Sequence, residues 1–498
     1  MNWSVALPLL ILASSLVTGL LIFALAEERH RLRGALNLAG ALIKLVLVVV
    51  MLQGVFQGQS YEARYSILPG IDFALRADAL AMLFVALSAV LWLFTTIYAI
   101  GYLEGSPHRS RFFGFFSLCV TATMGIALAG NLFTFFIFYE LLTLSTYPLV
   151  VHRGTDKALR AGNVYLGYTL AGGAVLLVGV VWLYSLMGNV EFTQAGVLSG
   201  VDPAYHPQLI IIFALLIIGL GVKAALVPLH GWLPVAMVAP APVSALLHAV
   251  AVVKAGAFGI VRVVYDVYGI EFADDLGLLM PLAIAASITI IYGSLRALTQ
   301  DDLKKRLAFS TVSQVSYIAL GVSLFGPLGT AGGLVHLVHQ GIMKITLFFC
   351  AGNLAETLGI HRVSEMGGAG RRMPWTMAAF TIAAFGMIGV PPMAGFISKW
   401  YLGLGALSAD MTWVLGVLVG SSLLNAAYFL PALYAVWFKP QQGPWPQERP
   451  RRRLETSGWL LLPPLVTAAL TIGAGLFAGA EFSPLEWVRL AMVREYLR

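Results

Sequence analysis

Lysines are concentrated inside the apolar segments of this sequence, where few other charges occur. Five of the nine lysines fall within hydrophobic runs, but at most one of the 22 arginines does so. Arginine keeps its proton in a protein, whereas a desolvated lysine can release one. The bias therefore predicts groups that bind and release protons. The five residues are Lys44, Lys223, Lys254, Lys344 and Lys399.

Glu140 is the one acidic residue deep in an apolar run, 131–150. An ionised side chain at the centre of a bilayer costs about 2.5–3.5 kcal/mol when nothing compensates it, so Glu140 needs a cation. An intramembrane lysine is the obvious partner, because a nearby carboxylate helps a lysine to hold its proton and withdrawal of the carboxylate helps to release it. The alternative is a structural polar contact between helices.

Prolines interrupt two of the apolar runs beside a lysine. A proline has no N–H group and frees the carbonyl of the preceding turn, and the freed groups attract water and ions. Two such interruptions predict an ion site near the bilayer midplane, while a plain proline kink in each helix is the alternative. The prolines are Pro228 and Pro234, which follow Lys223, and Pro391 and Pro392, which precede Lys399.

Histidines accompany the remaining lysines. His248 precedes Lys254 in one run, and His336, His339, Gln340 and Lys344 share another. Positions 336, 340 and 344 are four residues apart and lie on one face of a helix. Histidine titrates near neutral pH and relays protons. Metal binding is the alternative, but no acidic or cysteine ligand accompanies these histidines, so no metal is expected.

Two basic residues within the runs belong to no such group. Lys44 is expected to be structural or to extend to the membrane surface. Arg262 lies at the end of the run 243–265, and its long side chain is expected to reach the interface.

The composition fixes the class of protein. Of the 498 residues, 59% are hydrophobic and 11% charged, whereas soluble domains carry about 25% charged residues. This excludes a soluble enzyme and a disordered chain. The net charge of +7 is scattered, so no nucleic-acid partner is expected. No phosphate loop, haem or flavin motif occurs, and Cys119 and Cys350 are the only cysteines, so we expect no cofactor.

Apolar runs long enough to cross a bilayer, about 20 residues, occur fourteen times. They are residues 3–26, 34–54, 77–101, 112–130, 131–150, 163–187, 207–228, 243–265, 278–298, 305–325, 329–352, 373–401, 411–438 and 459–481. If the first helix runs inward, the basic loops 29–33, 153–160, 304–306 and 449–453 are cytoplasmic and the acidic loop 266–277 is outside. The positive-inside rule thus predicts fourteen helices with both termini outside.

Several motifs occur together in a fixed order. They are Lys223 with Pro228-Leu-His-Gly-Trp-Leu-Pro234, Ala239-Pro-Ala-Pro-Val-Ser-Ala-Leu-Leu-His248, Lys254-Ala-Gly, Asp301-Asp-Leu-Lys-Lys-Arg-Leu-Ala-Phe-Ser310, and Gly389-Val-Pro-Pro with Lys399. With Glu140, they resemble the antiporter-like proton-translocating subunits of complex I, membrane-bound hydrogenases and Mrp-type cation/proton antiporters. The resemblance covers residues 70–440 approximately.

The resemblance implies an all-α polytopic membrane fold that contains two inverted repeats of five helices. The repeats are the fourth to eighth and the ninth to thirteenth helices, and the seventh and twelfth are interrupted. The implied parts are 1–111 (the first three helices), 112–265 (first repeat), 278–438 (second repeat) and 456–498 (the last helix and the tail).

The resemblance also implies a role for each site residue. Glu140 and Lys223 are the proton-loading pair, and Lys399 is the exit toward the outside. The central proton axis between them consists of His248, Lys254, His336, His339 and Lys344.

Two functions follow from the resemblance. A lysine at position 399 fits both a D-like subunit of an Mrp antiporter and some complex I subunits. We favour the Mrp D-like subunit, which implies exchange of H⁺ for Na⁺ or K⁺. The alternative is a proton-pumping subunit in the membrane arm of a complex I-type NADH:quinone oxidoreductase or a membrane-bound hydrogenase. A plain membrane scaffold disagrees with the buried charges. Either assembly implies other membrane subunits as partners, the cytoplasmic (inner) membrane of a prokaryote, and no redox site in this chain.

Overall fold

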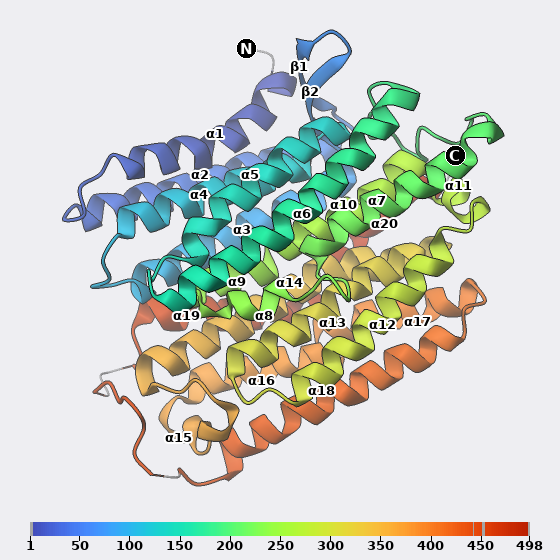
Figure 1. Cartoon of the computed structure of the whole chain (residues 1–498). Coiled ribbons are helices and arrows are strands. Elements are labelled where there is room, and N and C mark those ends of the chain that lie inside the picture. The colour runs from blue at the N-terminus through green and yellow to red at the C-terminus, as the bar shows by residue number, and fades with distance from the viewer. Residues whose placement is uncertain (1–2, 442, 451–453, 497–498) are drawn as a thin grey trace.

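The structure is a computed structural model and describes residues 3–441, 443–450 and 454–496. Parts of three predictions lie outside the described residues: residues 1–2 of the first predicted part (1–111), residues 497–498 of the last part (456–498), and residues 451–453 of the basic loop 449–453. Within the described part, nearly all regular structure is helical. The long helices lie side by side in one tilted bundle (Figure 1).

Every predicted span coincides with a helix or with a broken pair of helices. The first half contains α1 (Trp3–Phe23), α2 (His30–Phe56), β1 (Tyr61–Leu68), β2 (Ile71–Ala77), α3 (Ala79–Tyr102), α4 (Arg109–Leu128), α5 (Leu132–Val150), α6 (Asp156–Met187), α7 (His206–Ala224), α8 (Trp232–Val235), α9 (Ala241–Ala249) and α10 (Val252–Arg262). The second half contains α11 (Ile270–Asp275), α12 (Leu279–Leu298), α13 (Leu303–Ser323), α14 (Pro327–Leu358), α15 (Ala369–Arg372), α16 (Pro374–Ile388), α17 (Ala394–Ser408), α18 (Trp413–Phe438), α19 (Gly458–Leu476) and α20 (Pro484–Tyr496).

Twelve helices among the described residues are long and apolar enough to cross a membrane, so the chain is a polytopic helical membrane protein. The other two predicted spans are α13, which is rich in hydroxyl and amide side chains, and the pair α16 and α17, which is interrupted. These two therefore depart from a plain apolar helix in segments where the sequence predicts polar function.

Both predicted interruptions are present. Residues 225–231 separate α7 from α8, and residues 389–393 separate α16 from α17. In each gap the regular backbone hydrogen bonds of a helix are absent, so carbonyl groups at the end of the preceding helix are free to bind other donors.

The prolines lie in these gaps with one exception. Pro228, Pro391 and Pro392 are in the gaps, whereas Pro234 lies within α8. A proline is tolerated there because the N–H groups of the first helical turn have no partner within the helix.

A third interruption was not predicted. The expected helix 243–265 is divided at Val250 and Ala251 into α9 and α10, and a π-helix (Val263–Tyr268) continues α10. Neither residue at the break is proline or glycine, so the sequence offers no local signal for it. His248 and Lys254 therefore lie on opposite sides of a break.

The centre of the bundle consists of α14 and of α9 with α10. In Pro327–Leu358 and Ala241–Tyr268, every residue of the most apolar 18-residue stretch is buried, against 28% in α6. These central helices carry the predicted proton axis, which is therefore enclosed by protein on all sides.

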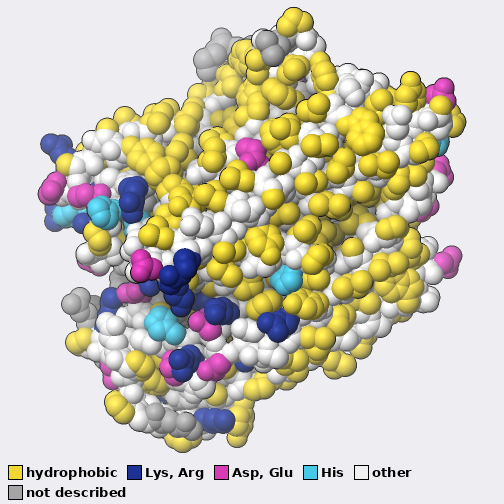
Figure 2. Space-filling view, viewed as in Figure 1, with side chains coloured by type: hydrophobic (Ala, Val, Ile, Leu, Met, Phe, Trp, Pro, Cys, Tyr) yellow, Lys and Arg dark blue, Asp and Glu magenta, His cyan; other side chains and the backbone are white. Residues whose placement is uncertain are grey.

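The outer surface has the polarity of a membrane protein. Figure 2 shows a broad hydrophobic face over the long helices, with Lys and Arg at the left and lower left, where Asp and Glu also occur, and with Asp and Glu but few Lys or Arg along the right edge. This distribution accords with basic loops at one end of the helices and acidic loops at the other.

An antiparallel hairpin of β1 and β2 lies between α2 and α3, in a segment for which no structure was predicted. Tyr61 pairs with Ala77 and Tyr65 with Phe73. Alternating residues on both sides of Pro69-Gly70 are the sequence signal that would have predicted it.

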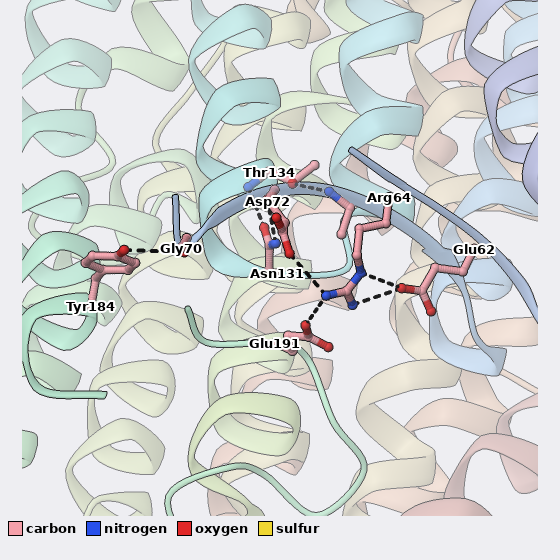
Figure 3. Close-up of polar contacts among 9 residues, drawn as sticks. Glu62, Arg64, Gly70, Asp72, Asn131, Thr134, Tyr184 and Glu191 are labelled. Carbon is pink, nitrogen blue, oxygen red and sulfur yellow. Dashed lines mark hydrogen bonds and ion pairs between the residues drawn. The ribbon is translucent and has the colours of Figure 1, made fainter. Parts of the chain in front are cut away.

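The hairpin is attached to the turn that begins α5, as Figure 3 shows. Gly130 N donates to Ala74 O at 2.8 Å, Ala74 N donates to Thr134 Oγ1 at 2.9 Å, and Asn131 Nδ2 donates to Asp72 O at 2.8 Å. The hairpin thus fixes the start of the helix that carries Glu140.

Arg64 attaches the hairpin to the loop that follows α6 (Figure 3). Its guanidinium contacts Glu62 at 2.9 Å, Asp72 at 3.3 Å and Glu191 at 2.5 Å. The hydrogen bond from Arg64 lowers the pKa of the Glu191 carboxyl below its ordinary value, so both charges are present at neutral pH.

Asn131→Ala is expected to lower stability, because Asn131 also caps α5 by accepting from Thr134 N at 2.8 Å. The expected loss is about 1–2 kcal/mol in the free energy of unfolding. Urea unfolding in detergent measures it, with Asn189→Ala in the loop after α6 as the control. Equal stability of the two variants would mean that the hairpin does not support α5.

The C-terminal helix α20 is a second element that was not predicted. Ser483 Oγ accepts from Glu486 N at 3.1 Å, which caps the helix, and Ser-Pro-Leu-Glu at its start is a sequence signal for this. Trp487 Nε1 donates to Ala79 O at 2.7 Å, so α20 packs on the start of α3.

Candidate proton-transfer site

Glu140 projects from the middle of α5 and is half-buried. Its Oε1 is enclosed and has no hydrogen-bond partner among the described residues. Gly173 of α6 lies against the carboxylate: a Cβ atom at this glycine would be 2.3 Å from Glu140 Oε1. A side chain at 173 would therefore displace the carboxylate.

Lys223 lies in the last turn of α7, directly before the first interruption, and is fully buried. Its ammonium donates to the carbonyl of Tyr139 and lies 3.3 Å from the centre of the Tyr139 ring. The Tyr139 hydroxyl donates to Gly219 O at 3.0 Å, which holds α5 and α7 together at this point.

The predicted pair is brought together, but without a direct ion pair. Among the described residues, no ion pair within 4.0 Å joins Glu140 to Lys223, although their charges interact. The reason is the direction of α5: the carboxylate faces Gly173 of α6, while the carbonyl of the preceding residue faces α7.

His248 and Lys254 lie at the centre of the bundle on either side of the α9–α10 break, and both are fully buried. His248 stacks on Phe348 of α14 with ring centres 4.5 Å apart. Within the described chain, neither ring nitrogen of His248 nor the ammonium of Lys254 has a hydrogen-bond partner.

α14 presents the second part of the axis, and the side chains of His336, His339, Gln340 and Lys344 are all buried. His336 Nδ1 is 2.8 Å from Ser398 Oγ of α17, whereas both ring nitrogens of His339 and both amide atoms of Gln340 lack partners among the described residues. Lys344 donates to Ser310 Oγ of α13 at 2.8 Å.

Partnerless polar atoms are therefore concentrated on these central helices. Buried polar groups in proteins normally bond to protein or to ordered water, so ordered water is the expected partner of these atoms. Chemically, the arrangement offers alternating amines and imidazoles that bind and release protons. No group of three or more His, Cys, Asp or Glu side chains in the described chain is placed to hold a metal ion.

Lys399 lies on α17 just after the second interruption. Its ammonium donates to Met387 O at 3.0 Å, Ile388 O at 2.8 Å and Ser422 Oγ at 2.9 Å. The two carbonyls are free because α16 ends there. Gly389 has a φ of +97°, and a Cβ at this position would be 2.8 Å from Lys399 Cδ, so only glycine fits the turn.

The other two basic residues within the spans are not part of the axis. Lys44 is fully buried and does not reach the surface; it donates to Ser15 Oγ at 2.5 Å. The expectation for Arg262 was wrong: only 1% of it is exposed, and it contacts Asp78 and Asp266, each at 2.8 Å. These carboxylates compensate the charge, so the side chain has no need to reach water.

Asn425 and Tyr428 of α18 lie beside the axis and were not among the predicted site residues. Both are buried, and Tyr428 is hydrogen-bonded to Ser310 at 2.9 Å. The spacing of Ser421, Asn425 and Tyr428, which places three polar residues on one helical face, is the signal that would have found them.

Comparison with known proteins identifies a family over most of the chain. The family described as "NADH:quinone oxidoreductase/Mrp antiporter, TM" matches residues 129–425. The family described as "NADH-Ubiquinone oxidoreductase (complex I), chain 5 N-terminus" matches residues 69–113. The first match contains every predicted site residue.

Individual relatives belong to both kinds of assembly. NADH-quinone oxidoreductase subunit N of Desulforudis audaxviator is 38% identical over 82% of this chain and 82% of its own length. The D-type subunit of the Na(+)/H(+) antiporter of Alkalihalophilus pseudofirmus is 28% identical over 97% of this chain and 95% of its own. A chain of the Mrp complex from Dietzia sp. DQ12-45-1b has 25% identity and a TM-score of 0.87, covering 100% of this chain and 98% of that one. This chain therefore belongs to the family of membrane subunits shared by NADH:quinone oxidoreductases and Mrp antiporters.

Proposed function

We propose that this chain moves protons across the membrane. Protons are loaded at Glu140 and Lys223, pass along His248, Lys254, His336, His339 and Lys344, and leave toward the outside at Lys399. One observation carries the proposal: six of the eight titratable groups are buried inside the bundle and Glu140 and Lys399 are half-buried, yet many of their polar atoms have no protein partner within the described residues. Groups held this way are suited to exchanging protons with water rather than to stabilising the fold.

The order of elements supports two inverted five-helix repeats, α4 to α10 and α12 to α18. The third helix of each, α6 and α14, has 32 residues. The fourth helix of each is interrupted, with Lys223 before the first gap and Lys399 after the second. The proposed parts are accordingly 1–111, 112–265, 278–438 and 456–498, with both termini on the outer side of an inner membrane.

An Mrp-like assembly, in which a D-type subunit exchanges H⁺ for Na⁺ or K⁺, is the first candidate. The near-complete coverage in both directions by the Na(+)/H(+) antiporter relative and by the Mrp chain favours it. A proton-pumping role in a complex I-type arm is the second candidate, favoured by the 38% identity to an NADH-quinone oxidoreductase subunit N. In both, other membrane subunits complete the assembly.

The test is proton transport by the native assembly, purified with its partner subunits and reconstituted in vesicles that contain a pH-sensitive dye. An imposed Na⁺ or K⁺ gradient drives proton movement if the assembly is an antiporter, whereas NADH with a quinone drives it in a respiratory complex. An assembly that moves protons under neither condition would contradict the proposal.

Lys254→Met is expected to lower transport by about 100-fold, in the range of a positioned acid–base group. Methionine keeps the length of the side chain and cannot carry a proton. Some transport remains because His248 and Lys344 are next to the site. Lys157→Met, at an exposed lysine early in α6, is the control; equal rates for the two variants would remove Lys254 from the path.

A further inference from the structure

An unbroken line of hydrogen bonds leads from Lys344 to α18. Lys344 Nζ donates to Ser310 Oγ at 2.8 Å, and the Tyr428 hydroxyl is 2.9 Å from the same oxygen. The Tyr428 hydroxyl also bonds to Asn425 Oδ1. All four side chains are buried, so water does not compete freely with these contacts.

The line continues from Asn425 to Lys399. Asn425 Nδ2 donates to Met387 O at 3.1 Å, and Lys399 Nζ donates to the same carbonyl at 3.0 Å. Met387 is in the last turn of α16, directly before the interruption. Asn425 and Lys399 therefore share one acceptor at the point where the helix is broken.

Tyr428 has one hydroxyl proton but two acceptors, Ser310 Oγ and Asn425 Oδ1. It can donate to only one of them at a time, and the charge of Lys344 decides which. An ammonium only donates, so charged Lys344 donates to Ser310 Oγ. The positive charge makes that oxygen a weaker acceptor for a second proton and repels the O–H of Tyr428, so Tyr428 donates to Asn425 Oδ1. Neutral Lys344 can instead accept from the Ser310 hydroxyl, whose oxygen then accepts more strongly. Tyr428 therefore turns to Ser310, and Asn425 Oδ1 loses its donor.

We propose that Tyr428 is a positioning residue that couples the protonation of Lys344 to the environment of Lys399. When Tyr428 turns to Ser310, Asn425 is no longer held at its oxygen, and its bond to Met387 O weakens. That carbonyl is then more available to Lys399, which stabilises its ammonium. The proton itself does not pass through the link, because an amide and a carbonyl do not relay it. The inference rests on the proposed function, in which both lysines carry protons.

Lys344 is the titratable group at the inner end of this link, and it lies among other charged and polar groups. The charges that interact with it are His248 on α9 and Lys254 on α10; on α13 and α18 it meets the hydroxyls of Ser310 and, through it, Tyr428. Arg306 of α13 donates to the main-chain carbonyl of Tyr428 at 2.8 Å. This contact fixes the backbone and leaves the hydroxyl free to rotate.

Tyr428→Phe removes the hydroxyl and keeps the ring. In the reconstituted assembly, we expect proton transport to fall about tenfold, as for the loss of one hydrogen bond linked to a charged group. Tyr434→Phe, at an exposed tyrosine on the same helix, is expected to transport normally. In the background of Ser310→Ala, which already breaks the link, Tyr428→Phe is expected to add nothing. Independent losses, or an active Tyr428→Phe variant, would overturn the coupling.

A readout independent of transport is the ultraviolet resonance Raman ring doublet of tyrosine, which responds to the hydrogen bonding of the phenolic hydroxyl. Subtracting the Tyr428→Phe spectrum isolates the signal of Tyr428. The doublet is expected to change in Lys344→Met, and an unchanged doublet would overturn the proposal. If Lys344→Met and Lys399→Met transport normally, the proposed function fails; if both are inactive while Tyr428→Phe resembles its control, only the coupling fails.

Discussion

Lys399→Arg is expected to abolish proton transport while the complex assembles normally. Arginine retains the positive charge, so the carbonyls of Met387 and Ile388 remain bound to a cation. It cannot release its proton at any pH reached in a cell. If Lys399 passes protons outward, the rate falls by about 1,000-fold, within the range for a lost acid–base group. Dye-loaded vesicles with the purified assembly measure this rate.

Lys439→Arg is the matched control for Lys399→Arg, because Lys439 is exposed after the end of α18. It is expected to transport at the normal rate. A fully active Lys399→Arg variant would mean that residue 399 contributes only a positive charge and that protons leave elsewhere. The comparison separates these cases because both variants keep the net charge of the chain unchanged.

The helices were predictable because crossing a bilayer requires about 20 apolar residues, and that length is visible in sequence. The interruptions at Pro228 and Pro391 were predictable for a similar reason, since proline removes a backbone donor. The break at Val250 and Ala251 was not, because both residues are compatible with a helix and the break depends on tertiary packing. The hairpin of β1 and β2 was missed because its short alternating pattern is a weaker signal than the long apolar runs on either side.

The site was predictable in its membership but not in its contacts. Lysine, unlike arginine, can give up its proton, so the bias toward lysine in the spans indicated the axis. The acceptor of each ammonium depends on how the neighbouring helix is turned about its own axis. Lys223, for example, donates to the carbonyl of Tyr139 rather than to the carboxylate of Glu140. Tyr428 was missed because the polar face that it forms with Ser421 and Asn425 is a weak signal within an otherwise apolar helix.

Glu140→Gln is expected to stop proton loading, with a loss of about 1,000-fold in transport. Glutamine keeps the shape of the side chain and fits beside Gly173, but it has no charge and holds no exchangeable acid proton. The ammonium of Lys223 lies one residue away, on the carbonyl of Tyr139. Without the carboxylate, that lysine loses the nearby negative charge and keeps the carbonyl and the ring of Tyr139. Because loading is proposed to need both members of the pair, Lys223→Ala is expected to show the same defect.

The geometry at Glu140 allows a sharper comparison than the loss of charge alone. Gly173→Ala keeps the carboxyl group of Glu140 but changes its position, because a Cβ atom at residue 173 would be 2.3 Å from Glu140 Oε1. If loading depends on the position of the charge relative to Lys223, Gly173→Ala is impaired as well, whereas Glu271→Gln at an exposed position remains normal. Full activity of Glu140→Gln beside an inactive Lys223→Ala would show that the lysine loads protons without a carboxylate. In that case, proton loading does not depend on the distance between Glu140 and Lys223.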